Sequence, residues 1–143
     1  MTDSKPDPSG NGVPELIDEI LGSLYFPFYI VNAETYRIEL INEAARKGRD
    51  VGDVTCHLLT HPNPEPCDSE QHGCPLKDVK RTGERATMIH THFMEDGEPR
   101  LFKVHGVPIK DENGKIVKMI EYSIDITDQT RAEEESRRAL EAL

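Results

Sequence analysis

The chain has 143 residues, of which 36% are hydrophobic and 31% charged, and its formal net charge is -10. This length predicts one domain with a core of its own, and the acidic balance argues against nucleic acid or an anionic membrane as a direct partner, because both require a basic surface. No apolar run approaches the roughly 20 residues of a membrane helix. The N-terminus also has no secretory signal, so we expect a cytoplasmic protein with no membrane contact from this segment.

The first half of the chain predicts a tail, a helix and a β-hairpin. Residues 1–13 are rich in Pro, Gly, Ser and Asp and are expected to form a disordered tail. Apolar residues at helical spacing predict an amphipathic helix from Pro14 to Leu24. Two β-type runs follow, and Asn42 then has the position of a helix N-cap. The first run covers 28–31, and in the second Tyr36, Ile38 and Leu40 alternate with polar residues. A short helix is expected over 43–47 and should end at Gly48.

The second half predicts a helix, three strands and an exit helix. The helix covers 76–81, and turn signals separate the strands, which cover 85–94, 101–109 and 116–126. Asp128 is expected to cap the N-terminus of the exit helix. Because this helix reaches Leu143 without a C-terminal capping residue, we expect the chain to be part of a longer protein. Two ion pairs are expected on this helix, Glu133–Arg137 and Glu134–Arg138. A short, weakly apolar seam would suit a coiled coil, and a solvated helix is an equal alternative; the seam residues are Ala132, Ser136, Ala139 and Leu143.

A proline-rich loop at 55–75 holds every cysteine of the chain. Three cysteines and a histidine have the spacing C-x4-H-x5-C-x6-C, and these residues are Cys56, His61, Cys67 and Cys74. Thiolate and imidazole are the ligands that zinc and iron–sulfur clusters prefer. Three cysteines do not suit a disulfide framework, and clustered thiols beside prolines favour metal binding over core packing.

The order of the predicted elements is similar to that of PAS domains. Segment 107–116, Val-Pro-Ile-Lys-Asp-Glu-Asn-Gly-Lys-Ile, resembles the strand-turn-strand signature of that family. Segment 120–128, Ile-Glu-Tyr-Ser-Ile-Asp-Ile-Thr-Asp, resembles its final strand, which ends in Asp-Ile-Thr before a signalling helix. The resemblance implies an α+β PAS fold, a five-stranded antiparallel sheet flanked by short helices. The chain then divides into a tail (1–13), a PAS sensor domain (14–127) and the start of a signalling helix (128–143).

The loop resembles that of a PAS subset with Cys, His five residues on, Pro-Cys and Cys-Pro-Leu. Those positions are Cys56, His61, Pro66-Cys67 and Cys74-Pro75-Leu76. Three thiolates and one imidazole suit either a tetrahedral zinc site or a two-iron iron–sulfur cluster. The cluster is preferred and zinc is the alternative, because a PAS domain normally reports a signal and only the cluster would sense redox state or oxygen directly. His61 is the expected fourth ligand and His72 the second choice, whereas His57 directly follows Cys56 and is expected to point away.

Other readings of the residues stay open. The cysteines could form a thiol–disulfide switch without metal. The core could hold a small molecule or haem, although a hydrogen-bonded role for His90, His92 and His105 is favoured and no Cys-x-x-Cys-His is present. The flavin-photoreceptor motif is also absent, because Cys56 precedes His-Leu-Leu.

The chain carries no phosphate loop, Gly-x-Ser-x-Gly or His-Glu-x-x-His motif, so it is not expected to be an enzyme. The resemblance implies a downstream output domain such as a histidine kinase as its partner. Apolar stripes on the helix up to Leu24 and on the exit helix suggest a homodimer.

Overall fold

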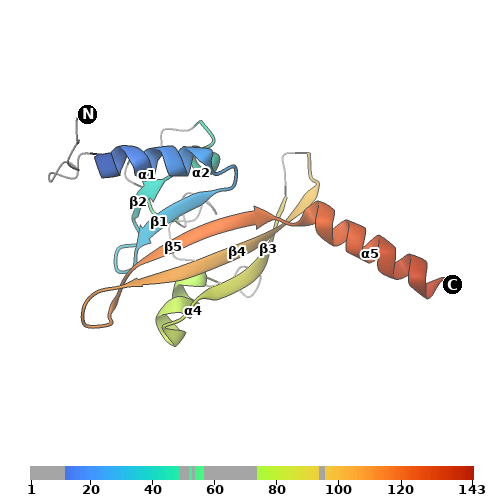
Figure 1. The fold of residues 1–143 in the computed structure, drawn as a ribbon. Coiled ribbons are helices and arrows are strands. Elements are labelled where there is room, and N and C mark those ends of the chain that lie inside the picture. The colour runs from blue at the N-terminus through green and yellow to red at the C-terminus, as the bar shows by residue number, and fades with distance from the viewer. Residues whose placement is uncertain (1–11, 49–51, 53, 57–73, 94–95) are drawn as a thin grey trace, which may run out of the picture.

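The computed structural model of the protein describes residues 12–48, 52, 54–56, 74–93 and 96–143 (Figure 1). Its elements in chain order are α1 (Gly12–Ser23), β1 (Phe28–Asn32), β2 (Ile38–Ile41), α2 (Glu43–Arg46), α4 (Pro75–Thr82), β3 (Ala86–Phe93), β4 (Pro99–Lys110), β5 (Ile116–Asp125) and α5 (Thr127–Glu141). Among the described residues, no helix combines the length and the hydropathy that a membrane crossing requires.

The strands form one five-stranded sheet in the order β2-β1-β5-β4-β3, and every neighbouring pair is antiparallel. The α+β architecture with a five-stranded antiparallel sheet and flanking helices is therefore confirmed. Strand β5 lies at the centre, where it pairs with β1 on one side and β4 on the other. The last strand before the exit helix is thus also the strand that joins the two halves of the sheet.

The core lies on one face of the sheet, which we call the inner face. Tyr29 and Val31 of β1 and Met119 of β5 are buried there, together with Leu76 and Val79 of α4. A Cβ atom built on Gly106 of β4 would lie 2.9 Å from Met119 Sδ, 3.1 Å from Pro75 Cβ and 3.4 Å from Val79 Cγ2. The missing side chain at Gly106 therefore lets α4 pack directly on β4 and β5.

Helix α1 joins the sheet through one buried amide, that of Asn42. Its Oδ1 accepts hydrogen bonds of 3.0 Å from the backbone N–H groups of Phe28 and Ala45, so it caps α2 as predicted. Its Nδ2 donates to the carbonyl oxygens of Phe26 at 2.9 Å and Leu21 at 3.5 Å. The beginning of β1, the start of α2 and the end of α1 therefore share one side chain.

Three details of the predicted elements are wrong. Helix α2 ends at Arg46, and Lys47 rather than Gly48 is its C-cap, with a left-handed φ of 54°. Tyr36 does not extend β2, because its φ of 63° lies in the left-handed region and the strand begins at Ile38. Asp128 does not cap α5, which begins at Thr127 with Ile126 at the N-cap position. The carboxylate of Asp125 instead accepts hydrogen bonds from both the backbone N–H and the hydroxyl of Thr127.

Helix α5 extends away from the sheet (Figure 1), and every residue from Arg131 onward is exposed. The predicted Glu134–Arg138 pair is present at 3.1 Å. Arg137 lies 3.8 Å from Glu134 and 4.0 Å from Glu141, rather than beside Glu133, whose carboxylate accepts from Gln129 at 3.1 Å. Beyond its first turn the helix is therefore exposed to solvent on all sides.

Candidate functional site

The segment that carries Cys56 is attached to the edge of the sheet beside β2. The backbone N–H of Cys56 donates to the carbonyl of Tyr36 at 3.0 Å, and that of Ile38 donates to Val54 at 2.9 Å. An isolated antiparallel bridge joins Arg37 to Thr55. These contacts fix the backbone at Cys56, whose side chain is half-buried and packs against the core cluster.

Cys74 lies at the opposite end of the loop, at the N-cap position of α4. Pro75 follows in the first turn, where a missing N–H costs the helix nothing. The half-buried side chain of Cys74 packs against the same core cluster as Cys56.

The structure therefore brings both ends of the cysteine loop to one core cluster. The other predicted ligands, His61, Cys67 and the second-choice His72, lie outside the described residues, as does His57. Within the described part of the chain, no three His, Cys, Asp or Glu side chains are grouped so as to hold a metal ion. Of the predicted ligands, only Cys56 and Cys74 therefore lie in the described part of the chain.

The three strand histidines lie on two faces of the sheet. His90 is buried on β3, and its ring centroid lies 6.1 Å from that of His92, as expected for two residues on one face. His105 of β4 stacks on Tyr122 at 4.6 Å, and its Nδ1 lies 3.3 Å from the Thr87 hydroxyl. Burial, together with Lys103 and Arg85, lowers the pKa of His105. A neutral, hydrogen-bonded imidazole is consistent with the structural role favoured for it.

The sequence did not single out Glu121, the most unusual titratable residue that the structure describes. It lies at the centre of β5 on the inner face, opposite Tyr29 of β1 and Gly106 of β4, and it is only 8% exposed. Burial raises the pKa of its carboxyl to about 8. In the sequence, its burial was indicated only by its position two residues after Met119, because residues two apart on a strand share a face.

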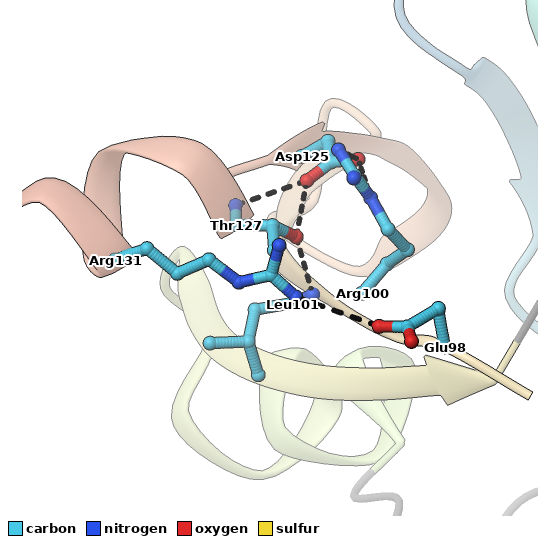
Figure 2. A network of polar contacts seen from close by, with 6 residues as sticks. All are labelled: Glu98, Arg100, Leu101, Asp125, Thr127 and Arg131. Carbon is cyan, nitrogen blue, oxygen red and sulfur yellow. Dashed lines mark hydrogen bonds and ion pairs between the residues drawn. The ribbon is translucent and has the colours of Figure 1, made fainter.

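A polar network joins the end of the sheet to α5 (Figure 2). The Oδ2 atom of Asp125 accepts from Arg100 Nε at 2.9 Å and lies 2.8 Å from its Nη2. Asp125 Oδ1 accepts from the Thr127 hydroxyl at 2.6 Å, and the Thr127 oxygen accepts from the backbone N–H of Leu101 at 2.8 Å. Burial raises the pKa of Asp125, but the bonds from Thr127 and Arg100 outweigh it, so the net pKa is lowered.

One ion pair lies beyond this network. Arg131 of α5 lies 3.9 Å from Glu98, which precedes β4, and both side chains are more than half exposed. A solvated pair of this length contributes little. The buried Thr127, rather than this pair, therefore fixes the first turn of α5.

Comparison with known proteins agrees with this architecture. Residues 21–131 match the PAS fold family. An RNA-binding light-oxygen-voltage receptor is similar with a TM-score of 0.68 and 15% identity over 100% of this chain, which spans 40% of that longer chain. The PAS domain of BvgS from Bordetella pertussis has a TM-score of 0.58 and 18% identity, covering 94% of this chain and 98% of that one.

A sensory box histidine kinase/response regulator from Burkholderia thailandensis has a TM-score of 0.53 and 17% identity, with 89% of this chain and 98% of that chain covered. No curated protein matches the chain in sequence. At these identities the similar structures establish a common fold. Since the family match extends over most of the chain, from the end of α1 to the first turns of α5, this chain belongs to the PAS fold family.

Proposed function

We propose that this PAS sensory domain binds a metal centre through Cys56, His61, Cys67 and Cys74 and responds to redox state or oxygen. One observation carries the proposal: Cys56 and Cys74 begin and end the loop, and both pack against the same core cluster. The segment between them carries the other two proposed ligands, His61 and Cys67. His72 is the alternative to His61.

The donor set favours a soft metal centre. Three thiolates and an imidazole suit a tetrahedral zinc site or a two-iron iron–sulfur cluster. A cluster would supply a reversible one-electron change, whereas zinc would only stabilise the loop. A sensory domain needs a change that it can report, so the iron–sulfur cluster is the preferred centre and zinc the alternative.

The residues that follow Cys74 could pass a displacement to the exit helix. Cys74 precedes the first turn of α4, whose Pro75 and Val79 lie against the position of Gly106 in β4. Strand β4 pairs with β5, which ends at Asp125, and Asp125 binds Thr127 of α5. A shift of α4 relative to β4 would therefore reach α5 through two directly paired strands.

We further propose that the domain is a non-enzymatic input for an output domain such as a histidine kinase, by analogy with the similar sensory box histidine kinase/response regulator. Reduced thiolates persist in the cytoplasm, which is the compartment proposed for it. A homodimer is proposed through α1. That helix presents an apolar stripe to solvent: Val13, Leu16, Ile17 and Ile20 are 57%, 54%, 40% and 52% exposed.

The decisive experiment is metal analysis with an absorption spectrum on anaerobically purified protein. Iron and sulfide with visible absorption would support the cluster, and one zinc in a colourless protein would support the alternative. Intact mass without metal but with two hydrogens lost would instead indicate a disulfide switch and overturn the metal proposal.

Single substitutions assign the ligands. Cys67→Ser and Cys74→Ser should each lose the bound metal, while His57→Ala should retain it and serves as the control. His61→Ala and His72→Ala distinguish the two candidate histidines, since only the ligand variant should lose metal or shift the spectrum. Full metal occupancy in Cys67→Ser would rule out the proposed set.

A further inference from the structure

Glu121 is a buried acid at the centre of the sheet. Its backbone pairs with Tyr29 of β1 and Gly106 of β4, so its side chain shares the inner face with those of Tyr29 and Met119. Within the described part of the chain, its carboxyl makes no hydrogen bond or ion pair, and burial alone perturbs it. A buried carboxylate without a partner is strongly disfavoured, whereas a neutral carboxylic acid is tolerated.

We propose that Glu121 is a buried proton-binding site whose occupancy is transmitted along β5 to the exit helix. This second input is independent of the proposed metal centre. The proton is its ligand, and the chemical change is the reversible transfer of one proton between the Glu121 carboxyl and solvent. A neutral side chain suits the apolar inner face, and a charged one requires a rearrangement that admits a counter-charge or water.

The described elements that surround Glu121 provide no charge to compensate its carboxylate. From β1 the facing group is the Tyr29 phenol, and from β4 it is Gly106, which has no side chain. Helix α4 contacts this face through apolar residues, and its charged ones are not among its buried set: Lys77, Asp78, Lys80 and Arg81. On the same sheet face, β3 carries the buried His90. The other titratable groups that the structure describes against the core cluster are the phenol of Tyr36 and the thiols of Cys56 and Cys74.

The position of Glu121 on β5 explains how a structural change at its side chain would reach α5. Asp125 lies four residues later in β5 and forms the network that binds Thr127. Val104 of β4 pairs with Ser123, and Phe102 pairs with Asp125, so the backbone between Glu121 and α5 is continuously bonded. A change in the pairing at Glu121 therefore reaches the Leu101–Thr127 bond through a few strand residues.

Nuclear magnetic resonance of the full chain tests the proposal. The Glu121 side-chain carboxyl should titrate with a midpoint near 8, where burial places its pKa. The backbone amides of Leu101 and Thr127 should shift with the same midpoint. In Glu121→Gln, an uncharged analogue of the protonated acid, those amide shifts should disappear.

Glu112→Gln is the matched control, because Glu112 lies exposed in the turn between β4 and β5 and its loss should leave the titration unchanged. A Glu121 carboxyl already charged at neutral pH would overturn the proposal. Unchanged titration of Leu101 and Thr127 in Glu121→Gln would also overturn it. If that variant does not fold, the carboxyl titration of the wild-type chain still decides whether the site binds a proton.

Discussion

The hydroxyl of Thr127 donates a hydrogen bond of 2.6 Å to Oδ1 of Asp125. The Thr127 hydroxyl oxygen in turn accepts a hydrogen bond of 2.8 Å from the backbone N–H of Leu101, in the neighbouring strand β4. Thr127 is only 2% exposed, so neither bond can be replaced by water without opening the junction. The first residue of α5 is therefore bound to both strands at this end of the sheet (Figure 2).

Thr127→Val should loosen this junction. Valine keeps the shape of threonine but leaves the N–H of Leu101 without its acceptor, and such a loss costs about 1–3 kcal/mol. We expect a lower free energy of unfolding in urea and faster amide exchange at Leu101. Thr130→Val, one turn later in α5, is the control and should have a small effect. Equal effects of the two substitutions would contradict the assigned role of the Thr127 hydroxyl.

Stability should fall as the pH rises because of Glu121. The pKa of its carboxyl is about 8 in the folded chain against an ordinary value of 4.5, so between these values the folded state binds the extra proton. The contribution to stability is complete below 4.5 and is lost as the pH rises toward 8. The loss is at most about 1.4 kcal/mol per pH unit.

The comparison with Glu121→Gln isolates this effect from the other titrating groups. The free energy of unfolding, measured in urea at several pH values, should decrease less steeply with pH in Glu121→Gln than in the wild-type chain. Parallel pH profiles for the two proteins would show that Glu121 ionises equally in the folded and unfolded states.

Gly106→Ala should destabilise the fold. The new methyl group would lie 2.9 Å from Met119 Sδ and 3.1 Å from Pro75 Cβ, so α4 must move outward. Overpacking of this kind costs roughly 1–3 kcal/mol. Gly22→Ala is the control, because its added Cβ meets nothing within 4 Å in α1, and it should stabilise the helix by about 0.5–1 kcal/mol. Thermal unfolding of the two variants in parallel measures both effects.

The proposed dimer predicts a clear response to charge on α1. Ile20→Glu places a carboxylate in the exposed apolar stripe, 52% exposed at that residue, and should convert the dimer to a monomer in sedimentation experiments. Ile89→Glu on β3 is the control, since Ile89 is similarly exposed at 59% but lies outside both terminal helices. Dissociation by Ile89→Glu alone would place the contact on the sheet instead.

The order of helices and strands was predictable because local chemistry determines it. Asp111 illustrates this: its carboxylate accepts from the N–H groups of Asn113 and Lys115, and Gly114 adopts a φ of 82°, which together form the predicted turn. The N-cap role of Asn42 was predictable for the same reason. Each of these signals lies within a few residues of the structure that it specifies.

The features that sequence did not predict depend on distant parts of the chain. The burial of Glu121 follows from pairing with β1 and β4, and its apolar neighbours Ile120 and Ile124 do not reveal which face of β5 is inward. Tyr36 leaves the strand pattern although its side chain suits a strand, and its ring lies 4.9 Å from the Lys80 ammonium of α4. The spacing of the cysteines predicted a metal centre. That Cys56 and Cys74 pack against one core cluster could be learned only from the folded structure.

Asn42 carries a mechanical consequence for this domain. The side-chain amide of Asn42 is hydrogen-bonded to the backbone of Leu21, Phe26, Phe28 and Ala45. A single side chain therefore connects the three elements α1, β1 and α2. A rotation of α1 must therefore either break these hydrogen bonds or displace the start of β1 and of α2 with it.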